Sequence, residues 1–191
     1  METMTVTSVT EEFLDLYRLP DTALVIIAKE LSPEDLSNLC DVNSRFLFLS
    51  NYLPSELEIK GPDFHEYGPH SGHFEPEDYF DGPKMFSRVK KITMSFDWRD
   101  QGYGNRKGMI WYEVTRNGEI ISSNMRLEDY ESYPHVAPHR TEHKVIVIED
   151  GPSLQSIRKG DILKFKRNVG GGGGHSLQVQ NFVCILELVK C

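Results

Sequence analysis

The sequence predicts an α+β chain in which a small N-terminal three-helix module precedes an antiparallel β-sandwich of the jelly-roll kind. Two observations lead to this prediction. The spacing of apolar residues is helical up to about residue 52 and alternates beyond Arg88. The charge changes at the same place: residues 1–86 carry 17 acidic and 5 basic side chains, a net of −12, whereas residues 87–191 carry 12 acidic and 16 basic, a net of +4.

These changes divide the chain into four expected segments: a flexible N-terminus over 1–12, a helical module over 13–60, a linker over 61–86 and a sandwich over 87–191. A hydrophobic content of 39% with 26% charged residues excludes disorder throughout. No stretch reaches the roughly 18 apolar residues of a spanning helix, and the start has no secretory leader. We therefore expect a cytoplasmic or nuclear chain with no membrane partner.

Charge and cysteine content exclude further classes. Phosphate binding needs a basic footprint, so the acidic first half argues against a nucleic-acid partner. The three cysteines are too few and odd in number for a disulfide framework, and they contain no C-x-x-C pair for zinc. We expect no cofactor.

Three short helices are expected between Phe13 and Tyr52. The first carries one apolar stripe, with Pro20 suited to its first turn. Ser32 is placed to cap the second helix, with Pro33 at its first position. Either Asn43 or Ser44 caps a third, very apolar helix. So small a unit buries itself poorly, and we expect a partner to cover its apolar side.

This helical segment resembles the F-box. The similarity covers about 35 residues and rests on Leu19-Pro20, on Leu31-Ser32-Pro33-Glu34-Asp35-Leu36 and on Val42-x-x-Arg45-Phe46. The chain departs from the usual pattern at Thr22-Ala23 and Cys40-Asp41. The resemblance implies that the module binds the Skp adaptor of a cullin-RING (SCF-type) ubiquitin ligase, and with it the cullin scaffold. The positions it implies at the adaptor are Leu19, Pro20, Leu24, Ile27, Leu31, Leu36 and Phe46. Alternatively, the three helices pack their apolar stripe on the β-module of the same chain.

The proline- and glycine-rich residues 61–86 show neither helical nor alternating spacing, which predicts a linker ordered in patches. We expect its aromatic residues Phe64, Tyr67, Phe74, Tyr79 and Phe80 to dock on the following domain.

Beyond the linker, alternation predicts roughly seven strands and no long helix. The clearest alternating sets are Ile92, Met94 and Phe96, and then Ile110, Tyr112 and Val114. Turns are expected at Asn117-Gly118, Gly151-Pro152 and Lys159-Gly160-Asp161.

Two loops of the predicted sandwich carry candidate ligand-binding residues. Residues 100–108 mix glycines with an acid, amides, cations and Tyr103, and residues 170–174 are five consecutive glycines. Glycine lets backbone N–H groups approach a ligand closely, although a mobile hairpin explains the glycine run equally well. The region from Lys90 to Val189 resembles jelly-roll modules with galactose-binding-like folds, which implies ligand capture at one end. The candidate residues are Trp98, Asp100, Tyr103, Asn105, Arg106, Trp111, Gly172, His175 and Ser176.

The histidines suggest a metal site less well than they suggest surface loops. His65, His70 and His73 lie in an acidic stretch, whereas Pro134 and Pro138 disfavour the helix that would align the second trio, His135, His139 and His143. The glycine run lacks the lysine of a phosphate loop, and no nucleophile elbow or acid–base pair stands out.

We therefore expect a non-enzymatic substrate-recognition subunit of an SCF-type ubiquitin ligase, with the sandwich recruiting the substrate protein. The net charge of +4 favours an acidic partner. The alternative is a carbohydrate- or small-ligand-binding sandwich, with a glycosylated partner, whose helical segment has no ligase role.

Overall fold

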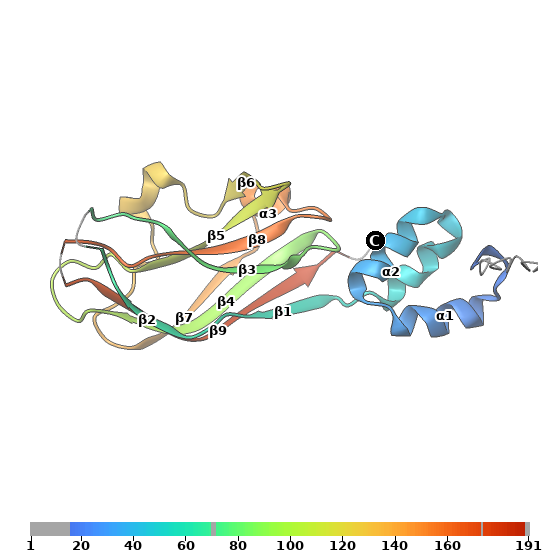
Figure 1. The fold of residues 1–191 in the computed structure, drawn as a ribbon, viewed down its shortest axis with the longest axis horizontal. Coiled ribbons are helices and arrows are strands. Elements are labelled where there is room, and N and C mark those ends of the chain that lie inside the picture. The colour runs from blue at the N-terminus through green and yellow to red at the C-terminus, as the bar shows by residue number, and fades with distance from the viewer. Residues whose placement is uncertain (1–15, 70–71, 173, 190–191) are drawn as a thin grey trace, which may run out of the picture.

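The computed structural model describes residues 16–69, 72–172 and 174–189, so the N-terminal segment 1–12 lies outside the described residues. Short helices gather at one end of the molecule and a long β-sandwich extends away from them (Figure 1). The helical end comprises η1 (Leu16–Arg18), α1 (Asp21–Glu30), α2 (Pro33–Val42) and η2 (Ser44–Tyr52), of which η1 and η2 are 3₁₀ helices.

The helix boundaries follow from local capping. Pro20 precedes α1 in an extended conformation and supplies a carbonyl to its first turn. At α2, the hydroxyl of Ser32 accepts a hydrogen bond from the Asp35 backbone N–H at 3.1 Å. At η2, the side chain of Asn43 accepts from the Arg45 N–H at 2.9 Å. The expected caps of the second and third helices are confirmed, with Asn43 rather than Ser44 at η2.

The sandwich consists of two antiparallel sheets in the described residues. Sheet A contains β1 (Glu56–Lys60), β2 (Phe64–Tyr67), β4 (Val89–Asp100), β7 (Glu142–Ile148) and β9 (Ser176–Leu188). Sheet B has the order β3 (Glu77–Lys84), β8 (Ile162–Asn168), β5 (Met109–Arg116) and β6 (Glu119–Ser123). Two short helices, η3 (Leu127–Ser132) and α3 (Pro152–Ser156), join the strands. The predicted combination of helices with an antiparallel sandwich is present.

The structure departs from the expected linker over residues 61–86, because β2 and β3 lie within it. Likewise β1 lies inside the expected helical module and pairs with β9, as β2 does. All three are edge strands, where charge and proline are tolerated and alternation is weak. The described residues beyond Arg88 hold six strands, where roughly seven were expected, and β1–β3 come before Arg88.

The aromatic residues of that segment mostly dock as expected. Phe64, Tyr79 and Phe80 pack against the main core, and Phe74 packs against a second, smaller cluster. Tyr67 is 75% exposed and does not dock.

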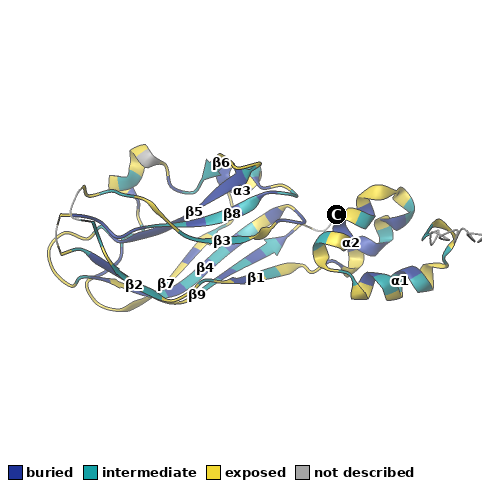
Figure 2. Cartoon of the chain, viewed as in Figure 1, coloured by how far each residue is buried: buried dark blue, intermediate teal, exposed yellow. Residues whose placement is uncertain are grey.

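The main core lies between the two sheets (Figure 2). Phe182 of β9 stacks on Phe96 of β4 in the same sheet, with ring centroids 5.5 Å apart, and meets Phe165 and Phe80 of sheet B at 5.2 and 5.4 Å. Burial of large aromatic rings of this kind dominates core energetics. The core continues without a break into the helical end, where Leu24, Leu36, Phe46 and Leu49 belong to the same cluster.

The contacts that fix the helices on the sandwich come from α2. The Ser37 hydroxyl donates to the Phe86 carbonyl at 2.8 Å in a buried position. Lys84 pairs with Glu34 at 2.7 Å, and Lys159 pairs with Asp41. Polar contacts of α2 therefore join the module to the sandwich, and the two share one apolar core, as the alternative arrangement requires in part.

The second cluster lies on the outer face of sheet B. Ile110, Tyr112 and Val114 of β5 face the main core, so the alternate residues Met109 and Trp111 point outward. Met125, Tyr133 and their neighbours cover them. Strand β5 is thus buried on both faces.

Candidate functional site

Three of the residues implied at an adaptor surface lie in the module's own core. Leu24, Leu36 and Phe46 are 0%, 2% and 1% exposed, so their side chains hold the helices together and present nothing to a partner. A helix stripe in a small module must first bury itself against neighbouring helices, which is why the strongest apolar positions are inward. Leu19, Ile27 and Leu31 are half-buried, and Pro20 is exposed.

Other apolar side chains form the accessible surface of the module. On it, large apolar side chains that are more than two-fifths exposed come from η1, both helices and η2, and we call them the helical apolar surface: Tyr17, Ile26, Val42, Leu47 and Tyr52. The run Val25-Ile26-Ile27 was the signal in the sequence, because three consecutive apolar residues cannot all face one core. The other members carry no such signal.

Arg45 holds the start of α1 against η2. Its guanidinium donates to the Leu19 carbonyl and lies 3.5 Å from the Asp21 carboxylate. The Arg-Phe pair of the F-box-like pattern therefore supports the module from within, with Arg45 fixing the chain entry and Phe46 packing at 5.4 Å from the Tyr17 ring.

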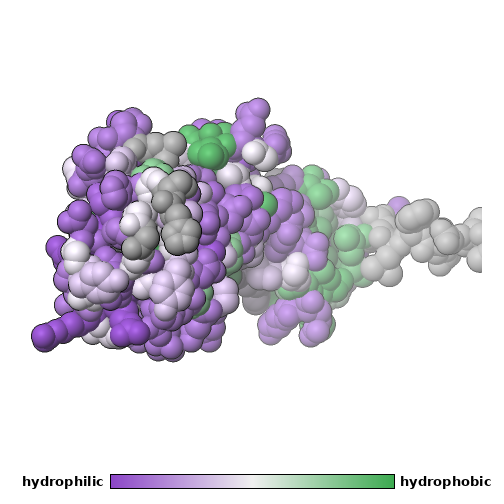
Figure 3. Space-filling model, turned by 60° about the vertical axis from the view of Figure 1, so that its left-hand side comes forward, coloured by the Kyte–Doolittle hydropathy of each residue, from purple (hydrophilic) through white to green (hydrophobic). Residues whose placement is uncertain are grey.

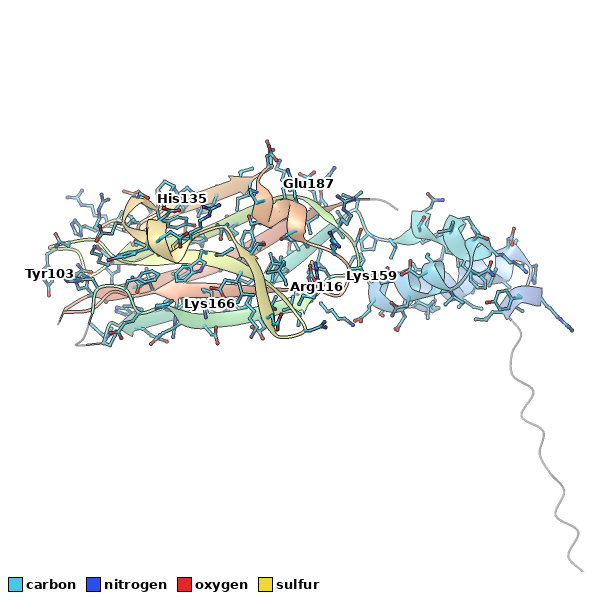
Figure 4. All side chains as sticks on the ribbon, turned by 90° about the horizontal axis from the view of Figure 1, so that it is seen from above. Tyr103, Arg116, His135, Lys159, Lys166 and Glu187 are labelled. Atoms are coloured by element: carbon cyan, nitrogen blue, oxygen red, sulfur yellow. The ribbon has the colours of Figure 1, made fainter. Side chains whose placement is uncertain are left out.

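The predicted ligand-binding residues of the sandwich lie at the end far from the helices, but they are not all accessible. Tyr103 is 67% exposed at this end (Figure 4), and Asn105, Arg106 and Gly172 are also exposed. Trp98 and Trp111 are 2% and 0% exposed, so the prediction that a sugar could stack on either ring is wrong.

The two predicted loops meet at this far end. The Gln101 amide donates to the carbonyls of Tyr103 and Asn105 at 2.7 and 2.8 Å and fixes the first loop. Its oxygen lies 3.5 Å from the backbone N–H of the buried Ser176, which follows the glycine run. A side chain at Gly174 would lie 3.1 Å from the Tyr103 hydroxyl, so the loops are in contact.

Asp100 and His175 place titratable side chains with buried polar atoms at this far end. Asp100 has a fully buried side chain whose Oδ1 accepts from the Gly102 N–H and lies near His139 Nδ1, both at 2.9 Å. Its Oδ2 is buried with no hydrogen-bond partner in the described residues, as is Nδ1 of His175. Burial, then neighbouring His73, lowers the pKa of His175, against an opposing effect of Asp100. The neutral imidazole is favoured.

Neither histidine trio forms a metal site in the part of the chain that the structure describes, where no group of three or more His, Cys, Asp or Glu side chains is placed to hold an ion. His70 lies outside the described residues. His139 and His143 instead pair with separate carboxylates, Asp100 and Asp97.

Sequence motifs did not reveal a hydrogen-bonded chain of Ser95, His143 and Asp97 on the outer face of sheet A. The two nitrogens of His143 lie 2.8 Å from Asp97 Oδ1 and 3.3 Å from Ser95 Oγ, and Asn181 donates to Asp97 Oδ2 at 2.8 Å. These hydrogen bonds, Asn181 first, lower the pKa of Asp97. Ser95 pairs with both β7 and β9, so its backbone serves the sheet and not an oxyanion hole. These hydrogen bonds link the three strands β4, β7 and β9.

A groove of about 770 Å³ opens between the free edges of the two sheets. Residues 121–135, from β6 through η3, form one wall, and residues 146–153, from β7 into α3, form the other. We call it the edge groove. No sequence signal marked it, because its walls come from edge strands of different sheets. The volume falls in the range of ligand sites, about 300–1,000 Å³.

Comparisons with known proteins add no family. No family model and no curated protein matches the chain. Among solved structures, the infectious bursal disease virus Gx strain matches with a TM-score of 0.42 and 8% identity over 69% of this chain and 32% of that one. The VP2 subviral particle of infectious bursal disease virus gives 0.41 and 7% over 70% and 32%. Dimeric latent PorU from Porphyromonas gingivalis gives 0.25 and 14% over 69% and 12%. The chain spans about a third of the viral chains. No described helix is long and apolar enough to cross a membrane.

Proposed function

We propose that the chain is the substrate-recognition subunit of an SCF-type ubiquitin ligase, in which the helical module binds the Skp adaptor and the sandwich recruits the substrate protein. The observation that carries this proposal is the helical apolar surface. Ile26 is 65% exposed, Val42 63% and Leu47 52%, on a module that uses its strongest apolar residues for its own core. Several large apolar side chains exposed on one small module are a feature of interaction sites.

The shape of the molecule supports the same division of labour. The helices lie at one end and the sandwich extends away from them (Figure 1). The surface at the far end is mainly hydrophilic, whereas apolar residues gather on the helical part behind it (Figure 3). An adaptor on the helices would leave the sandwich free for a substrate. The subunit would then act by proximity, because a shared scaffold raises the effective concentration of the substrate near the ubiquitin-charged enzyme.

Adaptor capture tests the proposal. The full chain is mixed with a purified Skp adaptor at micromolar concentration, and complex formation is measured by size-exclusion chromatography and calorimetry. We expect a stoichiometric complex that the double variant Ile26→Asp/Leu47→Asp weakens at least tenfold, since two charges would be buried at the interface.

The matched control is Ile120→Asp/Val145→Asp, which places the same charges on sandwich residues that are 63% and 48% exposed. This control should bind the adaptor as the wild type does. Absence of a complex with the wild-type chain, or equal weakening by both double variants, would overturn the adaptor role.

A second candidate function is carbohydrate binding at the far end of the sandwich. The exposed polar side chains of Asn105 and Arg106 at this end favour it, because they can form hydrogen bonds with sugar hydroxyl groups. Exposed Tyr103 would supply the stacking ring. Glycan-array binding by the full chain that Arg106→Ala and Tyr103→Ala abolish, without adaptor capture, would favour this function over the first.

A further inference from the structure

We propose that the edge groove binds an extended peptide that bears basic side chains, and that this peptide adds as a further strand to the free edge of β7. The proposal rests on the proposed function in one respect, since it takes this peptide as the recognition segment of the substrate. Its chemistry follows from the walls of the groove.

Both walls offer unpaired backbone. Strand β7 pairs with β4 and β6 pairs with β5, and in the described residues neither has a strand on its other side. A free strand edge carries a row of N–H and C=O groups that an extended chain can pair with. The seven residues of β7 at about 3.3 Å each would match roughly seven peptide residues.

The floor of the groove is fixed and apolar. Met125, Tyr133 and Ile146 line it and are 3%, 9% and 3% exposed. The Tyr133 hydroxyl donates to the Ile110 carbonyl at 3.1 Å, which anchors the floor to β5. Alternate side chains of an added strand would point onto this floor, and the others would lie beside Val145 and Val147, which are about half exposed.

One polar atom in the groove lacks a partner. Nδ1 of His135, which lines the groove, is buried and makes no hydrogen bond in the described residues. Buried polar atoms are nearly always paired, so a ligand group is a suitable partner for this one.

The charge of the groove selects the peptide. Its lining contains Glu128, Asp129 and Asp150 against a single arginine, Arg126. None of the four has an ion pair among the described residues, although Asp150 accepts hydrogen bonds from Gly151 and Gln155. A groove with unpaired carboxylates favours a basic peptide. The groove therefore favours a basic partner, whereas the net charge of the sandwich suggested an acidic one.

Elsewhere on the sandwich, carboxylates do form ion pairs with lysines. On the outer face of sheet B, Lys166 pairs with Asp78 at 2.6 Å, and Lys164 pairs with Asp81 at 3.4 Å. Charges there are matched within the chain.

The first test measures binding of the full chain to a fluorescein-labelled seven-residue peptide of alternating valine and lysine, and to its glutamate counterpart. We expect the lysine peptide to bind at least tenfold more tightly. The variant Glu128→Lys/Asp129→Lys should lose at least tenfold of this affinity. Its matched control, Glu56→Lys/Glu119→Lys, makes the same change of charge on exposed residues of β1 and β6 that do not line the groove and do not belong to β7. This control should stay within twofold of the wild type. Equal loss in both variants would show attraction by net charge alone and overturn the site.

The second test uses the same peptide with N-methyl groups on alternate residues, in the two possible registers. Strand addition predicts that one register binds at least tenfold more weakly and the other binds nearly as well as the parent, because only one set of N–H groups faces β7. Equal effects of both registers would overturn strand addition.

The two proposals fail separately. Glu128→Lys/Asp129→Lys should still capture the Skp adaptor, and Ile26→Asp/Leu47→Asp should still bind the peptide. Adaptor capture with no peptide binding would remove the groove site alone, whereas peptide binding with no adaptor capture would remove the ligase role alone.

Discussion

The helical module and the β-sandwich use apolar residues in opposite ways. The sandwich encloses most of its large aromatic rings between two sheets and covers even the outward residue Trp111, which is 0% exposed, although Tyr67 and Tyr103 remain on its surface. The module encloses Leu24, Leu36 and Phe46 but leaves residues such as Ile26 and Val42 on its surface. A two-layer sandwich has enough interior for most of its apolar residues and exposes others, such as Ile120 and Val145 on the edge strands β6 and β7, whereas a module of some 35 residues has less interior to offer. Apolar surface on the module is therefore where a partner is expected, and the sandwich offers edges and loops instead.

The strongest test of a self-sufficient sandwich is Phe182→Ala. The ring is 1% exposed and meets Tyr79, Phe80, Phe96 and Phe165 within 5.5 Å between centroids. We expect a loss of about 3–5 kcal/mol in the free energy of unfolding, from lost burial and the cavity left behind. Urea denaturation followed by fluorescence of the buried Trp98 and Trp111 measures it. A loss below about 1 kcal/mol would mean that the core is not closed around this ring.

The sandwich was predicted from the sequence where alternation is local. Ile92, Met94 and Phe96 are all 0% exposed, as their spacing indicates. The same alternation continues to Trp98, so it predicts that the Trp98 ring is buried and does not stack on a ligand. Trp111 could not be placed in this way, because its cover comes from residues 125–136, in and around η3, and from Phe74 before β3. Burial of both faces of a strand depends on tertiary packing, which a local pattern does not contain.

The site was less predictable than the fold. Strands β1, β2 and β3 pair with β8 and β9, about 80 to 130 residues later in the chain, so their role as strands depends on partners that short windows do not include. The edge groove has the same origin, since it forms where β6 and β7 leave their outer edges free. By contrast, the caps of the helical module depend on neighbours two or three residues away, and they were predicted.

The caps give a test of medium size on the other side of the comparison. Ser32→Ala removes the acceptor of the Asp35 N–H at the start of α2, which should cost about 1 kcal/mol. Because α2 carries the contacts to the sandwich, the loss should appear as a lower urea midpoint in the helical signal at 222 nm. Ser44→Ala, next to the cap of η2 rather than at it, is the control and should change stability by less than about 0.5 kcal/mol. Equal effects of the two substitutions would contradict the assignment of Ser32 as the cap.

The smallest expected effect is a dependence on pH that belongs to the sandwich alone. Burial, then Lys144, lowers the pKa of His135 below 6.5, and burial, then His73, lowers that of His175. The unfolded chain therefore takes up protons more readily than the folded chain as the pH falls below about 6.5. The stability that these groups contribute is fully present above this pH and is lost as the pH falls through the lower, folded pKa values.

We expect a lower urea midpoint at pH 5.5 than at pH 7.5, and a smaller difference in His135→Gln/His175→Gln. Carboxylates with lowered pKa values, such as Asp78 and Asp97, titrate below this pH range and do not contribute to the difference between the two urea midpoints. The described helical module, residues 16–53, contains no histidine, so this acid sensitivity cannot arise from its side chains. A double variant that keeps the wild-type difference would place the titrating groups elsewhere. An adaptor bound to the helical module should then leave the pH dependence unchanged only if those other groups lie outside the helices.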